Sequence, residues 1–234
     1  MKRGTVSEML YKTKEINFEK TRTQGIQFRD IIYEPYQKRD LNVLDHFKSK
    51  DHDYLLRIQK MESFEIYALL LNLCGDWNIG SMIRTSALSG IKKVFVYGRR
   101  RYDRRSSVGA EKYIDVEIIN GFVNETIEYD INLLKSFLDK NRFIPIYAEH
   151  GGEFLGSFSW KEKLNKIYSL NFYPLIIMGN ESRGIPEYVM NFFDNYSSLG
   201  FRVSIPQRGV MRSFNVGHAY SIILWDLRRE MNWI

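Results

Sequence analysis

The sequence predicts an α/β fold with a mostly parallel sheet and helices on both of its faces. Short, nearly continuous apolar runs are typical of strands that are buried on both sides. Between them lie longer stretches in which apolar residues recur every three or four positions, as in amphipathic helices. The chain has 234 residues, 44% of them hydrophobic, which is enough for one large domain with a proper core.

Six runs have the composition of strands. The run from Phe64 to Leu71 is the clearest, because it is almost entirely apolar. The run from Phe201 is stopped by Pro206, which cannot donate to a sheet ladder. The predicted strands are residues 64–71, 93–98, 114–119, 143–148, 174–179 and 201–205.

Five stretches between or after these strands have helical periodicity. Asn78 and Ser213 stand where an N-cap is expected, Gly90 can end the first helix, and Pro186 suits a first helical turn. The predicted helices are residues 78–90, 126–141, 159–166, 186–193 and 213–229.

Residues 1–61 are more polar than the rest and carry charges of both signs, with a basic first part. We interpret them as a basic, helical N-terminal extension to a main domain of residues 62–234. Two readings of this extension stay open: a solvated arm without a role, or an arm that grips RNA or embraces a second copy of the chain.

The composition excludes several classes of protein. The formal charge of +6 favours an acidic partner without identifying one. A single cysteine, Cys74, rules out an intramolecular disulfide, and the four histidines do not pair at metal-binding spacing. The N-terminus lacks the apolar region of a secretory signal, and no run reaches the ~18 apolar residues of a membrane span. We therefore expect a cytoplasmic protein with no membrane segment and no metal.

Three motifs lie at strand–helix junctions. The first reads Asn78-x-Gly80-x-x-x-Arg84-Thr85-Ser86-Ala87. If Asn78 caps the helix, Arg84 lies in its second turn, close enough to share one pocket. An arginine on an otherwise apolar helix needs an anionic partner or a wet cleft, although taken alone it could be an ordinary surface residue.

The second and third motifs are turns that follow buried strands. Gly179-Asn180-Glu181-x-x-Gly184 combines two glycines, which allow close backbone approach, with one carboxylate. The third motif, which runs from Ile205-Pro206 through Gly209 to Ser213-Phe214-Asn215-Val216, is a loop that leads into the last helix. Loops at the ends of rigid strands are common positions for binding and catalytic groups.

In this order, the three motifs resemble those of the SPOUT methyltransferases, in their TrmH-like branch. The resemblance covers about residues 62–234, with Gln207 and Phe214 departing from the usual methionine and leucine. It implies a fold with a deep C-terminal trefoil knot, S-adenosylmethionine as cofactor, and methyl transfer to a ribose 2′-hydroxyl of tRNA or rRNA. It also implies a homodimer with sites built across two chains.

The resemblance further implies roles for individual residues. Because a guanidinium stays protonated, we expect Arg84 to stabilise developing negative charge rather than to accept a proton. The implied catalytic residues are Arg84, Asn78, Ser213, Asn215 and Glu181. The implied cofactor-binding residues are Ala148, Met178, Gly179, Asn180, Gly184, Ile205 and Phe214.

A cluster of arginines lies between the first two motifs. Such a run is usually a solvated face, but this one is dense and follows the strand next to the first motif. Arginines suit bidentate phosphate contacts and base stacking, so we expect an RNA contact here. The cluster consists of Arg99, Arg100, Arg101, Arg104 and Arg105.

Two alternatives remain beside ribose methylation. One is a catalytically silent SPOUT-fold protein that binds RNA, although retention of Asn78, Arg84, Ser213 and Asn215 argues against it. The other is an RNA methyltransferase that acts on a base.

Overall fold

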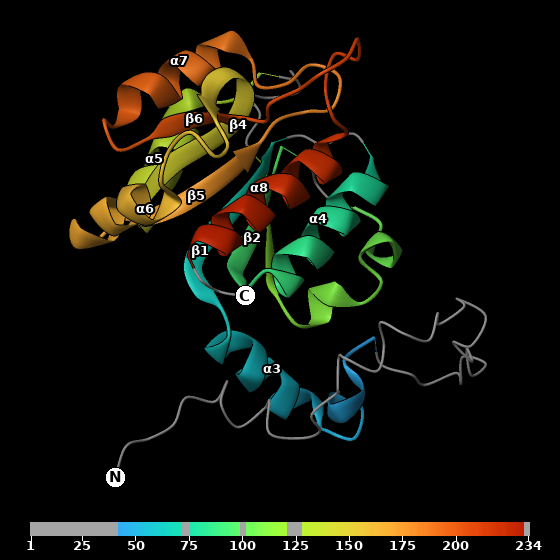
Figure 1. Cartoon of the computed structure of the whole chain (residues 1–234). Coiled ribbons are helices and arrows are strands. Elements are labelled where there is room, and N and C mark those ends of the chain that lie inside the picture. Colours follow the sequence, from blue (N-terminus) through green and yellow to red (C-terminus); the bar gives the residue numbers. More distant parts are fainter. Residues whose placement is uncertain (1–41, 72–74, 99–101, 121–127, 232–234) are drawn as a thin grey trace, which may run out of the picture. The chain divides into compact units, whose positions relative to one another are not determined.

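The computed structural model describes residues 42–71, 75–98, 102–120 and 128–231, and it has the predicted α/β architecture (Figure 1). All neighbouring strands are parallel, in the order β3-β2-β1-β5-β4-β6. Each predicted strand is confirmed. The strands are β1 (Phe64–Leu71), β2 (Ile91–Tyr97), β3 (Asp115–Ile119), β4 (Phe143–Phe154), β5 (Tyr173–Met178) and β6 (Phe201–Ser204).

Helices cover both faces of the sheet, as predicted. Ile79 of α4, Leu164 of α6 and Leu224 of α8 belong to one buried apolar cluster, while α5 and α7 contribute Leu134 and Val189 to a second cluster. Helices α4 and α8 lie side by side in Figure 1. The α-helices of the described residues are α3 (His52–Met61), α4 (Asp76–Leu88), α5 (Ile131–Asn141), α6 (Trp160–Ser169), α7 (Glu187–Tyr196) and α8 (Val216–Glu230), and the 3-10 turns are η2 (Asp45–Phe47), η3 (Arg104–Ser107) and η4 (Ala110–Lys112).

Three helices begin at other residues than predicted. Gly75, not Asn78, is the N-cap of α4, so Asn78 lies inside the first turn. Asn215, not Ser213, caps α8, because its Oδ1 accepts hydrogen bonds from the backbone N–H groups that follow it. Helix α5 begins after Asp130, whose carboxylate caps it, and residues 126 and 127 of the predicted helix lie outside the described residues.

Strand β4 extends beyond the predicted residue 148. Ala148 and Glu153 both pair with Val203 of β6, with an irregularity in the ladder between them. Pairing with β6 therefore carries the strand on to Phe154, although the sequence there is polar and contains Gly151 and Gly152. The irregularity gives the carboxyl end of β4 a bulged stretch beside β5 and β6.

Part of the predicted N-terminal extension is joined to the main fold. Helix α3 contacts α4 through the side-chain amide of Gln59, which donates a 2.9 Å hydrogen bond to the carbonyl of Ala87. Residues 1–41 lie outside the described residues, so the division at residue 62 stays a prediction, as does the trefoil knot. Within the described part of the chain, no helix is both long enough and apolar enough to span a bilayer.

Candidate active site

A cavity lies at the carboxyl ends of β4, β5 and β6, where parallel α/β sheets commonly bind their ligands. Its wall brings together the second and third motifs and the end of β4. All seven residues predicted to bind a cofactor line it, together with Glu181 and Ser213 from the predicted catalytic set. The seven are Ala148, Met178, Gly179, Asn180, Gly184, Ile205 and Phe214.

The second motif forms a closed turn at the edge of this cavity. The backbones of Asn180 and Gly184 exchange two hydrogen bonds, of 3.1 and 2.9 Å. Inside the turn, the side-chain oxygen of Asn180 accepts from the backbone N–H groups of Ser182 and Arg183. Gly179 is required because a Cβ there would lie 2.7 Å from the backbone carbon of Gly184. The turn therefore keeps its shape through its own backbone and the Asn180 amide.

Hydrogen bonds join the three motifs beside the cavity. Asn78 Nδ2 donates to Glu181 Oε1 at 2.6 Å, and Asn215 Nδ2 donates to Asn78 Oδ1 at 3.1 Å. The same Glu181 oxygen is 3.3 Å from the backbone nitrogen of Gly75, at the start of α4. A carboxylate at a helix N-terminus is stabilised by the partial positive charge there. We call this set, Glu181, Asn78 and Asn215, the amide relay.

Arg84 does not join the amide relay of its own chain. It follows Asn78 by six residues on α4, and at 3.6 residues per turn its side chain is turned by about 120° from that of Asn78. Arg84 is exposed and lines a second cavity, beside residues 42–59. The expectation that Asn78 and Arg84 share one pocket is therefore wrong within a single chain.

The third motif presents an exposed loop. Ile205 follows β6 directly, and Phe214, which is 44% exposed, and Ser213 line the first cavity. Val210 and Met211 are far more exposed, at 101% and 80%. The loop thus places one aromatic ring and one hydroxyl at the cavity while its tip stays open to solvent.

Comparison with known proteins identifies the family. Residues 65–225 match the sequence model of the SpoU rRNA methylase family. The chain belongs to this family. The match confirms the resemblance to TrmH-like SPOUT methyltransferases that the three motifs predicted. A relative in Borreliella burgdorferi, described as an uncharacterized tRNA/rRNA methyltransferase, is 25% identical over 191 residues, which are 82% of this chain and 70% of the relative.

Solved structures of SpoU proteins share the fold. The methyltransferase AviRb from Streptomyces viridochromogenes, in complex with AdoMet, is 20% identical with a TM-score of 0.54, over 73% of this chain and 58% of AviRb. An AdoMet-bound rRNA methyltransferase from Sinorhizobium meliloti is 21% identical with a TM-score of 0.53, over 75% of this chain and 59% of that one. This chain thus spans under two thirds of either protein. The A. aeolicus TrmH/SpoU tRNA modifying enzyme is 16% identical with a TM-score of 0.55, over 78% and 83% of the two chains.

One residue of this SpoU site was missed at the sequence level. Glu149, on the extended part of β4, lines the first cavity, and its Oε2 accepts a 3.2 Å hydrogen bond from the backbone N–H of Ile185. It thereby ties β4 to the second motif just after Gly184. A carboxylate immediately after a buried parallel strand was the available signal, since that position lies at the ligand-binding edge of the sheet.

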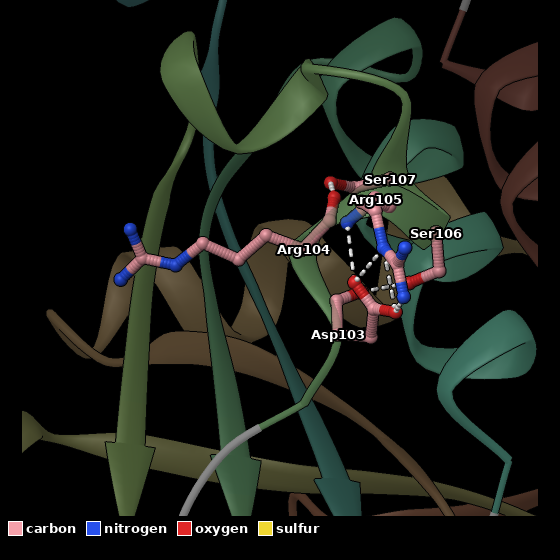
Figure 2. Close-up of polar contacts among 5 residues, drawn as sticks. All are labelled: Asp103, Arg104, Arg105, Ser106 and Ser107. Carbon is pink, nitrogen blue, oxygen red and sulfur yellow. Dashed lines mark hydrogen bonds and ion pairs between the residues drawn. The ribbon is translucent and has the colours of Figure 1, made fainter.

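Two of the five predicted RNA-binding arginines, Arg104 and Arg105, lie in the described residues, and both are exposed. Figure 2 shows them with their neighbours. Arg105 folds back onto Asp103, with Nη2 2.6 Å from Oδ2, and this guanidinium holds the pKa of Asp103 below its usual value. The Arg104 side chain points away from that pair. Among the described residues, no hydrogen bond or ion pair engages its guanidinium. Arg99, Arg100 and Arg101 lie outside the described residues.

The arginine-bearing turn packs directly on the helix of the first motif. A Cβ at Gly80 would lie 2.2 Å from the backbone carbon of Ser106, so only glycine allows this approach. Ser106 and Ser107 are buried there, while Arg104 stays exposed. The glycine of the first motif thus fixes the position of η3 relative to α4.

Proposed function

We propose that this SpoU family member transfers the methyl group of S-adenosylmethionine to a ribose 2′-hydroxyl of a tRNA or rRNA. The amide relay is the observation that carries the proposal. It joins one residue from each motif, with bonds of 2.6 and 3.1 Å, and one of the three, Glu181, lines the first cavity. Family membership supports RNA methylation, and the named AdoMet complexes of AviRb and the Sinorhizobium meliloti enzyme support the cofactor.

The first cavity suits an adenosyl group. Met178, Ile205 and Phe214 offer apolar surface for a flat base, and the closed turn of Asn180 to Gly184 offers backbone groups for polar atoms. Glu149 and Glu181 supply carboxylates that can accept hydrogen bonds from hydroxyl or ammonium groups. When bound there, the cofactor supplies an electrophilic methyl group on a sulfonium.

The relay and the third motif would position the RNA ribose. Ser213 lines the first cavity, and the amides of Asn78 and Asn215 are bonded to each other beside it; these groups would orient the hydroxyl for in-line attack. Attack by the 2′-oxygen would form a bond to the methyl carbon as the carbon–sulfur bond breaks, and the hydroxyl proton would leave to water, a phosphate oxygen or another base. A guanidinium would stabilise the negative charge on that oxygen.

We assign this guanidinium to Arg84 of a second copy of the chain. Within one chain, Arg84 lines the second cavity, whereas Ser213 and Phe214 line the first. A homodimer that brings Arg84 of one copy to the first cavity of the other would place this guanidinium beside the ribose, in addition to Arg212, which lines that cavity within its own chain.

Isothermal titration with S-adenosylhomocysteine, for the wild type and Phe214→Asp, tests the cofactor site. We expect about one site per chain, lost in the variant because a carboxylate replaces the apolar wall. Treating methylated tRNA and rRNA with alkali then locates the methyl group, since a 2′-O-methyl protects the adjoining phosphodiester. Cleavage at every methylated nucleotide would indicate a base-directed enzyme. Failure to bind S-adenosylhomocysteine or to methylate any RNA would indicate a silent RNA-binding member.

A further inference from the structure

A second cavity, of about 370 Å³, lies between residues 42–59 and α4. It lies outside the cofactor site, and the three motifs account for only two of its lining residues, Arg84 and Ala87. Its walls are largely apolar and include two partly exposed aromatic rings, Phe47 and Tyr113. Leu44 stands at its edge and is 66% exposed. The cavity is therefore open to a ligand from solvent.

Polar groups within this cavity are few and specific. The side-chain amide of Asn42 donates a hydrogen bond to the backbone carbonyl of Val108 at 3.2 Å, and that of Gln59 donates to the carbonyl of Ala87 at 2.9 Å. Each keeps an amide oxygen that can accept a hydrogen bond from a base edge. Arg84 is the one charged residue that lines the cavity within the described part of the chain. Flat apolar walls, amide acceptors and a single cation match a nucleobase with its phosphate.

The surroundings of the cavity favour RNA as the source of that base. Tyr113 and Ala110, which line it, belong to the same connection as the exposed Arg104. That connection is held on α4 where Ser106 packs against Gly80. Arg104 and part of the cavity lining therefore belong to one connection, so an RNA strand that contacts Arg104 would also lie near the cavity. The net charge of +6 favours a polyanion.

We propose that this cavity holds an unstacked nucleobase of the substrate RNA, stacked against Phe47 or Tyr113. The proposal rests on the proposed function and deepens it, because it gives residues 42–59 a part in substrate recognition. RNA enzymes and RNA-binding domains commonly read bases that are splayed out and stacked on aromatic side chains. Loss of one such stacking contact lowers affinity about tenfold.

Photocrosslinking of the full chain to a pool of short oligoribonucleotides that contain 4-thiouridine tests this assignment. We expect crosslinked peptides from residues 42–59 and 110–113. Leu44→Glu places a negative charge at the exposed edge, and Phe47→Ala removes one ring, so each should lower affinity for the pool about tenfold. Leu170→Glu, at another exposed leucine (52%) outside the cavity lining, is the matched control and should bind as the wild type does.

Sedimentation and titration with S-adenosylhomocysteine distinguish the ways in which the proposal could fail. Crosslinks that map only elsewhere, with unchanged affinity of Leu44→Glu and Phe47→Ala, would overturn the proposal. So would a Leu44→Glu variant that sediments as a monomer where the wild type is a dimer, because the cavity would then be a contact between chains. S-adenosylhomocysteine titration is run in parallel: if it fails while crosslinks map to the cavity, the methyltransferase function falls and the base-binding cavity stands.

Discussion

Asn78 and Glu181 are 103 residues apart in the chain, yet the Asn78 amide donates a 2.6 Å hydrogen bond to the Glu181 carboxylate. This bond fixes the turn after β5 to the first turn of α4. Because Asn78 also accepts from Asn215, the start of α8 is tied to the same point. Three segments that are distant in sequence are therefore positioned by two side-chain hydrogen bonds.

Removing the Glu181 carboxylate should disturb all three segments. In Glu181→Ala the amide of Asn78 and the N–H of Gly75 lose their acceptor, and we expect a loss of about 1 kcal/mol in the free energy of unfolding. S-adenosylhomocysteine should also bind more weakly, because Glu181 lines the first cavity. Urea denaturation and titration measure the two effects. Glu62→Ala, at the exposed C-terminal end of α3, is the control. Equal behaviour of the two variants would show that the relay has no role in the site.

The Asp103–Arg105 pair should restrain RNA binding. In Asp103→Asn the amide oxygen can still cap η3, but the charge that neutralises Arg105 is gone. If Arg105 then reaches an RNA phosphate, affinity should rise, and the slope of log affinity against log salt should steepen by about 0.7. Filter binding across a salt series measures both. Asp115→Asn, at the exposed start of β3, should change neither. An unchanged slope in Asp103→Asn would exclude Arg105 from the RNA contact.

The buried hydrogen bond between Ser86 and Tyr220 should contribute most to the stability of the fold below alkaline pH. Their hydroxyls are 2.7 Å apart between α4 and α8, and Ser86 also bonds to the Met82 carbonyl. Tyr220→Phe breaks this bond and should lower the free energy of unfolding by about 1 kcal/mol at pH ~8. Tyr54→Phe, on the more exposed α3, is the control and should have little effect.

The same pair gives a signed pH dependence. Burial raises the pKa of Tyr220 above its usual value near 10. The folded state therefore keeps the neutral hydroxyl, and this stabilisation is complete below pH ~10 and is lost as pH rises beyond it. Because phenylalanine does not titrate, the deficit of Tyr220→Phe should shrink when urea denaturation is repeated at pH ~11. A deficit that stays constant or grows would contradict the raised pKa.

Arg84 and Phe214 should complement each other in a mixture of variants. Arg84→Ala keeps the first cavity, and Phe214→Asp keeps Arg84, so each homodimer alone should be inactive toward RNA. After mixing and subunit exchange, half of the dimers are mixed and each has one intact site. Methylation should then recover to about a quarter of the wild-type rate. No recovery, with sedimentation confirming exchange, would mean that Arg84 does not act across two copies.

Much of the fold could be predicted because strands β1 and β5, at the centre of the sheet, are buried on both faces. The runs 64–71 and 174–179 are nearly all apolar, and such runs admit few readings other than strands in a covered parallel sheet. The extension of β4 to Phe154 could not be predicted, since Glu149 to Gly152 are polar or glycine and the strand resumes only by pairing with β6. That pairing is a tertiary effect which local composition does not reveal.

The candidate site was predictable in its residues but not in its geometry. The motifs placed Glu181, Ser213 and Phe214 beside strand ends, and those ends meet because the strands are parallel. The cap positions were wrong by two or three residues, since Asn78 bonds to Glu181 instead of its own helix, and Ser213 remains in the loop. This shift in α4 is also why the separation of Asn78 from Arg84 could not be foreseen.

The side chain of Asn215 makes hydrogen bonds in two directions at once. Its oxygen caps α8 by accepting from Gly217 and its nitrogen donates to Asn78. If the amide rotated by 180°, its NH2 group would face the backbone N–H of Gly217 and its oxygen would face the oxygen of Asn78. Both hydrogen bonds would be lost, so this rotation is disfavoured. The conformational entropy of this amide is therefore lost when the chain folds. A ribose that binds beside it does not have to order the amide again.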